Sequence, residues 1–234
     1  MPKTFRELFP QNSIIGMIHL AGDNSEEKLH RALDELHIYE EEGLNGAIIE
    51  DYHGSAKDVE RVLRESVKFD IPRGVNFLRE PLRGFETAYL SGAHFVQIDN
   101  IHKRDMDAHY PGYELNCREW PDILVLGGVR FKYQHPTGRS LQEDVHEGIH
   151  RCEAIVTTGD GTGVETPLDK LRDFRRIMDT YPLIVGAGVT AENVRQQLAI
   201  CDGAIVGSYF KEGDTQAPVV RGRVRELMKI VNQI

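Results

Sequence analysis

Eight short apolar runs recur along the chain at intervals of roughly 30 residues, the length of one strand–helix–strand step. The runs, with the turns that end the last three, are 14–20, 46–51, 74–79, 92–99, 123–133, 154–163, 183–190 and 203–208. Stretches with helical spacing of apolar residues lie at 24–42, 57–68, 82–91, 141–151, 167–178, 191–199 and 219–231. No linker or shift in composition divides the series, so we expect one domain over residues 1–234.

This alternation predicts an α/β fold of the (β/α)8 TIM-barrel type, with a doubly wound parallel sheet as the alternative. A length of 234 residues suits a single barrel. The alternation of strand and helix patterns breaks down between residues 102 and 121, where helical periodicity is poor. We therefore expect a shortened or irregular connection after the fourth strand, either a long loop or one short helix.

The composition limits the classes of partner. A formal net charge of -9 disfavours nucleic acid, because neutralising a phosphate backbone needs clustered lysine and arginine. No apolar run approaches the roughly 20 residues that span a bilayer, and the N-terminus resembles no secretory or transit peptide. The expected location is the cytoplasm. Three widely spaced cysteines, Cys117, Cys152 and Cys201, predict reduced thiols rather than a disulfide framework or a metal knuckle.

Polar residues follow nearly every predicted strand. In a TIM barrel the active site lies at the C-terminal ends of the strands, so these residues are the candidates for the mouth. They are His19, Glu50, Asp51, Asn76, Arg79, Asp99, Lys132, Thr158 and Asp160. Side chains alternate along a strand, and the sequence does not fix their phase, so each residue either lines the pocket or faces outward.

Glu50, Lys132, His19 and Asp99 are the candidate catalytic groups. A carboxylate and an amine facing one another in a closed pocket can divide the base and acid roles. The alternative for Glu50 and Lys132 is a structural ion pair that braces the mouth. His19 is either a general acid or base, or a hydrogen-bonded core histidine.

Glycine-rich turns follow the last two strands, at Gly186-Ala187-Gly188 and Gly207-Ser208. Glycine lets the backbone approach a ligand, and loops after strands seven and eight form the usual phosphate site of a barrel. We expect Gly186, Gly188, Gly207 and Ser208 to hold a phosphate; tight turns without a ligand are the alternative. Asn76, Arg79, Thr158 and Asp160 are the further candidate substrate-binding residues, and the 158–163 loop would face the substrate body.

A zinc-protease pattern, H-E-x-x-H, occurs at His146-Glu147-Gly148-Ile149-His150. Its context is wrong for a metal site, since the helix is short, contains Gly148 and runs almost directly into the sixth strand. On a barrel it would lie on the outer ring, far from the strand ends. We expect no metal and no cofactor.

Several motifs together resemble the BtpA/SgcQ family over nearly the whole chain. They are Gly16-Met17-Ile18-His19-Leu20, Ile48-Ile49-Glu50, Gly74-Val75-Asn76-Phe77-Leu78-Arg79, Thr158-Gly159, Thr162-Gly163, residues 185–194 and residues 202–207. The resemblance implies a TIM barrel of the ribulose-phosphate-binding type. The family is named for a photosystem I biogenesis factor and for a sugar-operon protein sometimes labelled a nucleosidase.

The chain departs from the family pattern at three strand ends. It has Glu50-Asp51 where the family usually has an acid–asparagine pair, Gln97 and Asp99 where it has arginine and asparagine, and Lys132-Tyr133 where it has lysine–histidine. These changes put a shared substrate in doubt.

The resulting expectation is an enzyme acting on a small phosphorylated metabolite, a sugar phosphate or a nucleoside-derived compound, by isomerase, lyase or nucleosidase-like chemistry. The alternative is a non-catalytic biogenesis or assembly factor that keeps the barrel and a ligand site. The resemblance also implies a homo-oligomer.

Overall fold

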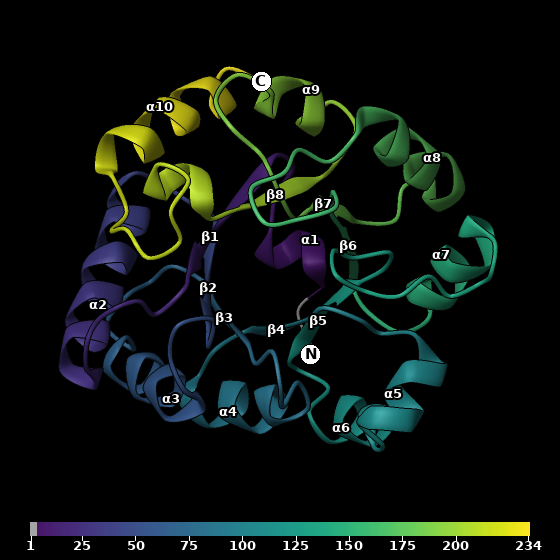
Figure 1. Ribbon diagram of the computed structural model, residues 1–234, viewed down its shortest axis with the longest axis horizontal. Coiled ribbons are helices and arrows are strands. Elements are labelled where there is room, and N and C mark those ends of the chain that lie inside the picture. Colours follow the sequence, from purple (N-terminus) through teal and green to yellow (C-terminus); the bar gives the residue numbers. More distant parts are fainter. Residues whose placement is uncertain (1–3) are drawn as a thin grey trace.

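The computed structural model describes residues 4–234 and contains a closed parallel barrel ringed by helices (Figure 1). Each strand pairs with the next in sequence, and β1 pairs with β8 to close the sheet. The strands are β1 Ser13–Ile18, β2 Gly46–Glu50, β3 Arg73–Asn76, β4 Phe95–Ile98, β5 Leu124–Gly128, β6 Ala154–Thr157, β7 Leu183–Val185 and β8 Gly203–Val206. The expected TIM barrel is confirmed, and the doubly wound alternative is wrong.

The outer ring comes from amphipathic helices that follow the strands. They are α2 Ser25–Glu41, α3 Ala56–Glu65, α4 Arg83–Ser91, α7 Leu141–Ile149, α8 Leu168–Met178, α9 Val194–Leu198 and α10 Arg221–Val231. In α2, for example, Leu29, Ala32 and Leu36 recur at helical spacing and are all buried. Within residues 4–234, no helix combines the length and apolar character needed to cross a membrane.

The connection after β4 contains two short helices, α5 Lys103–His109 and α6 Tyr113–Glu119. The expected irregular connection is confirmed, but it contains two short helices rather than a long loop or one short helix. Each helix buries a single large side chain, Met106 or Tyr113, so neither has an apolar stripe that periodicity would reveal. Arg151 holds α6 from outside it, because its guanidinium lies 4.7 Å from the Tyr113 ring centroid and pairs with Glu114.

The N-terminal end of the barrel is plugged by a short helix, α1 Phe5–Leu8, which lies in the middle of the ring in Figure 1. Phe5 and Phe9 belong to the same apolar cluster as the inward-facing strand residues, and Phe9 meets Phe95 edge-on at 5.3 Å between centroids. The functional opening is consequently at the other end, where the strands finish.

The fifth strand ends at Gly128, five residues earlier than its apolar run predicts. A Cβ at this position would lie 2.0 Å from the backbone oxygen of Asp99, so the ends of β4 and β5 approach closely. Beyond Gly128 the chain turns through Arg130 and Tyr133, both with left-handed backbone (φ 49 and 63). Lys132 therefore lies in the loop after β5 rather than on the strand.

Gly128→Ala should destabilise the protein by about 2–4 kcal/mol, because the new methyl group meets backbone that cannot move aside like a side chain. The matched control is Gly222→Ala at an exposed position of α10, where a Cβ meets nothing within 4 Å. That change should be neutral or stabilise by about 0.5–1 kcal/mol. Urea unfolding of both variants measures the difference, and equal stabilities would contradict the close approach.

Candidate active site

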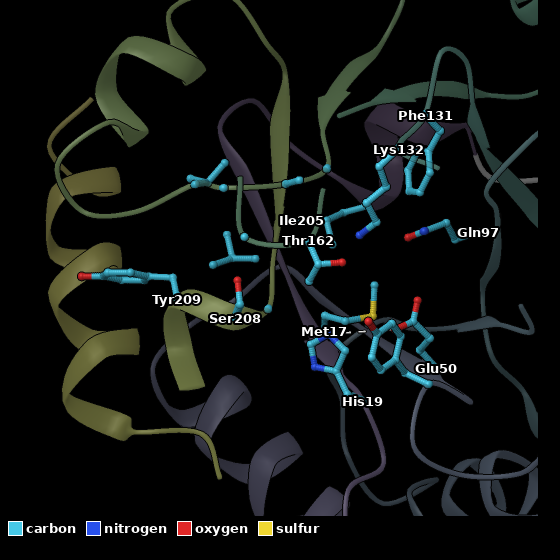
Figure 2. Close-up of a pocket in the computed structure, with 18 residues that line it drawn as sticks. Met17, His19, Glu50, Gln97, Phe131, Lys132, Thr162, Ile205, Ser208 and Tyr209 are labelled. Atoms are coloured by element: carbon cyan, nitrogen blue, oxygen red, sulfur yellow. Dashed lines mark ion pairs between the residues drawn. The ribbon is translucent and has the colours of Figure 1, made fainter. Parts of the chain in front are cut away.

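Two adjoining cavities open at the C-terminal ends of the strands. The narrow pocket, drawn in Figure 2, encloses about 30 Å³ between the ends of β1, β2, β4, β7 and β8. A larger cavity of about 500 Å³ lies beside it under the loop after β5. Phe131 and Lys132 line both, so one ligand can extend from the narrow pocket into the larger cavity.

Two buried carboxyl groups share one amide at the mouth. Asn76 Nδ2 donates to Glu50 Oε1 at 3.1 Å and to Asp99 Oδ1 at 3.0 Å. This contact follows from the fold, since Glu50 and Asn76 pair in the register of β2 and β3, and Asp99 directly follows β4. Gln97 Nε2 donates to the same Asp99 oxygen at 2.9 Å. Three adjacent strands thus bring both carboxyls together.

Burial changes the protonation of Glu50, which is 6% exposed. Desolvation, with the nearby charge of Asp99, raises the pKa of Glu50 to about 8 despite the opposing effects of Lys132 and Asn76. Burial also raises the pKa of Asp99, although amide donors from Gln97 and Asn76 and the charge of Lys132 oppose it. At neutral pH Glu50 therefore keeps its proton and can donate it.

His19 follows β1 and is 4% exposed. Its Nε2 lies 3.9 Å from Glu50 Oε2, the pair joined by the dashed line in Figure 2. Burial lowers the pKa of His19 well below its usual value, and the positive charges of Lys211 and Lys132 lower it further. His19 is consequently a neutral imidazole beside a protonated carboxyl, not half of a salt bridge.

Lys132 is placed by its backbone, whose N–H donates to Thr158 Oγ1 at 2.6 Å. Its ammonium lies 5.4 Å from the Phe131 ring centroid, and within residues 4–234 it forms no salt bridge to a carboxylate. Lys132 and Gln97 point toward one another across the pocket in Figure 2. The ammonium is thus free to neutralise negative charge on a ligand.

The opposite wall is a glycine rim formed by Gly163, Gly186, Gly188, Gly207 and Ser208, all of which line the narrow pocket. Across the described chain, the backbone N–H groups of Gly188, Gly207 and Ser208 donate no hydrogen bond to another protein group. A 3-10 helix, η1 Ser208–Lys211, follows β8 directly. Unpaired N–H groups converging on one pocket are suited to bind an anion.

Six of the candidates do not line the narrow pocket: Asp51, Asn76, Arg79, Asp99, Thr158 and Asp160. Thr158 is buried, and its hydroxyl accepts from Lys132 N and donates to Gly159 O, so it holds the loop in place. Asp99 and Asp160 line the larger cavity. Arg79 is exposed and lines neither cavity, because it lies three residues beyond the end of β3.

The H-E-x-x-H residues lie on the outer ring, as their position before β6 indicates. His146 and His150 are exposed on or beside α7. Glu147 accepts hydrogen bonds from Arg139 and from the backbone of Lys103, and these contacts hold the loop before α7 and the start of α5.

Gln97 and Thr162 are among the pocket residues that were not candidate site residues. Gln97 precedes Asp99 by two positions, so strand alternation places both on one face, and that signal could have identified it. Thr162 lines the pocket and is held by Tyr133, whose hydroxyl oxygen accepts from Thr162 N at 2.9 Å. No pattern in the sequence indicates this contact between two loops.

Glu50 should make the stability of the protein depend on pH. Its pKa is raised from 4.5 to about 8, so the folded state binds this proton more tightly, and the resulting stabilisation is lost as pH rises from about 4.5 through 8. Glu50→Gln removes the titration. Relative to wild type, the variant should gain stability with pH by up to about 1.4 kcal/mol per unit in this window. Urea unfolding from pH 5 to 9 measures it; parallel curves would contradict the buried proton.

Comparison with known proteins gives the family of the chain. A model described as the BtpA family matches residues 114–233. An uncharacterized protein of Pyrococcus furiosus is 28% identical over 97% of both chains, and the sgc region protein SgcQ of Escherichia coli is 25% identical over 70% of this chain and 65% of that protein.

Solved structures match the fold. Phosphoribosyl anthranilate isomerase from Thermotoga maritima covers 95% of this chain and 100% of its own, with a TM-score of 0.65 and 16% identity. Tryptophan synthase subunit alpha from Campylobacter jejuni covers 97% of this chain and 100% of its own, with a TM-score of 0.68 and 15% identity. Both similarities are of fold. On the family match and its agreement with the sequence motifs, the chain belongs to the BtpA family.

Proposed function

We propose that this protein is an enzyme that binds a small phosphorylated metabolite at the barrel mouth and transfers protons on it, as an isomerase, a lyase or a nucleosidase-like hydrolase. One observation carries the proposal: protonated Glu50 and unpaired Lys132 share one narrow pocket with the unpaired N–H groups of the glycine rim. An acid, a cation and an anion site within one ligand's reach are the parts that such chemistry needs.

The glycine rim is the proposed phosphate site. It combines the loop after β7 with the first residues of η1, the location that phosphate occupies in many barrels. Two structures with the same fold support this proposal, because each is associated with a phosphorylated compound. One is a phosphoribosyl anthranilate isomerase in complex with a reduced 1-deoxyribulose 5-phosphate compound, and the other is a thiamine phosphate pyrophosphorylase.

The acid and base roles divide between the two carboxyls. Glu50, kept protonated by burial, is the proposed proton donor. Asp99 accepts two amide N–H groups on one oxygen, which opposes the rise that burial causes in its pKa, and Asp99 is the proposed acceptor. Lys132 would stabilise negative charge that develops between them, and neutral His19 would pass or orient a proton.

Gly188→Ala should abolish anion binding. Gly188 has a left-handed backbone (φ 68), and a Cβ there would lie 2.3 Å from the backbone nitrogen of Glu165. Gly92→Ala is the control, because Gly92 has a similar φ of 65 but open space around it, away from the mouth. Wild type and the control should be stabilised by phosphorylated sugars, by roughly 2.7 kcal/mol at a hundredfold excess over Kd, and Gly188→Ala should not. Thermal unfolding with a panel of ligands measures this.

Glu50→Gln and Lys132→Ala should each lower turnover about 10²–10⁴-fold while ligand binding persists. The assay is turnover of the same panel of sugar phosphates and nucleoside derivatives. Binding without turnover by wild type would favour the alternative of a non-catalytic factor. Neither binding nor turnover would overturn the proposed function.

A further inference from the structure

Gln97 carries a buried polar atom that no protein group satisfies. It lies on β4, lines the narrow pocket and is 3% exposed. Within the described residues, its Oε1 has no hydrogen-bond partner. An unpaired buried acceptor costs about 1–3 kcal/mol, so one that also lines a pocket is a candidate for contact with a ligand.

The orientation of this amide is set by its neighbour. Gln97 Nε2 donates to Asp99 Oδ1 at 2.9 Å, and the same oxygen accepts from Asn76 Nδ2 at 3.0 Å, so it acts as an acceptor toward both amides. The nitrogen must therefore face Asp99, which leaves the oxygen turned into the pocket. Figure 2 shows the Gln97 side chain reaching into the pocket from the side opposite the glycine rim, toward Lys132.

We infer that Gln97 Oε1 accepts a hydrogen bond from a hydroxyl group of the ligand, so that the ligand is a hydroxylated, sugar-type phosphate. This rests on the proposed function, because the phosphate on the glycine rim is what brings the hydroxyl to Gln97.

The surrounding groups suit a polyol. Beside the Gln97 acceptor lie the carboxyl of Glu50 and the imidazole of His19, which has its own unpaired buried nitrogen, Nδ1. Hydroxyl groups both donate and accept, so a chain of them can satisfy all three side chains. An alkyl chain would satisfy none and would leave the Gln97 oxygen desolvated.

Lys132 is the competing donor, since its ammonium points toward Gln97 in Figure 2. No hydrogen bond joins the two in the described structure. If the ammonium were the natural partner of Gln97, Lys132→Met would free the oxygen and raise the preference for hydroxylated ligands; if a ligand hydroxyl is the partner, the preference stays as in wild type.

Calorimetry with matched ligands tests the inference. In the first pair, glycerol 3-phosphate is compared with n-propyl phosphate, and in the second, D-ribose 5-phosphate is compared with n-pentyl phosphate. Inorganic phosphate measures binding to the glycine rim alone. Gln97→Met keeps the side-chain volume, and Gln97→Leu is the second variant. The control is Gln197→Met on α9, because Gln197 is also buried with an unpaired Oε1 but lines neither cavity.

Wild type should prefer the hydroxylated member of at least one pair. Both Gln97 variants should reduce that preference roughly tenfold or more while inorganic phosphate binds as before, and Gln197→Met should keep it. An unchanged preference in the Gln97 variants, with phosphate still bound, would overturn the role of Gln97 and leave the proposed function standing. Absence of binding of every phosphate compound by wild type would overturn both.

Discussion

The amide of Asn76 is the contact on which the mouth of this barrel depends. Its nitrogen, Nδ2, donates to Glu50 Oε1 at 3.1 Å and to Asp99 Oδ1 at 3.0 Å. These two hydrogen bonds join β2, β3 and β4 where the strands end. Two carboxyls brought this close in a dry interior would otherwise repel each other as both ionise. The shared amide fixes their positions, and burial raises the pKa of Glu50 to about 8, so that this carboxyl keeps its proton at neutral pH.

The rest of the barrel gives this pair its surroundings. Phe5 and Phe9 plug the N-terminal end, so the carboxyls lie above a dry apolar interior. Across the mouth, the loop after β5 supplies Lys132, and the loops after β7 and β8 supply unpaired N–H groups. The buried carboxyls and the glycine rim thus come from opposite halves of the chain, and only barrel closure between β1 and β8 makes them face each other.

Sequence periodicity predicted the strands well because each is a buried apolar run that ends at a polar or glycine residue. It also placed Glu50, Asn76 and Asp99 among the candidates for the mouth, since strand ends meet at one rim. Prediction from periodicity failed where the strands end, because side chains beyond a strand no longer alternate between its two faces. Arg79 lies beyond the end of β3 and turns outward, and the strand before Lys132 ends early because Gly128 approaches the Asp99 backbone. Helices α5 and α6 depend on tertiary contacts of Met106 and Tyr113, which no local pattern records.

A buried ion pair links the geometry of the glycine rim to the charge state of His19. Lys211, at the end of η1, is 1% exposed and donates to Glu35 Oε1 of α2 at 2.5 Å, while Glu35 also accepts from Val219 N. Such a pair contributes little net stability, but it fixes one arrangement of the elements that it joins. It holds η1 in place behind the rim. The positive charge of Lys211 is also the second cause of the lowered pKa of His19. The lysine that holds the glycine rim in place therefore also helps to keep the neighbouring imidazole neutral, so an anion bound at the rim would oppose this effect and favour protonation of His19.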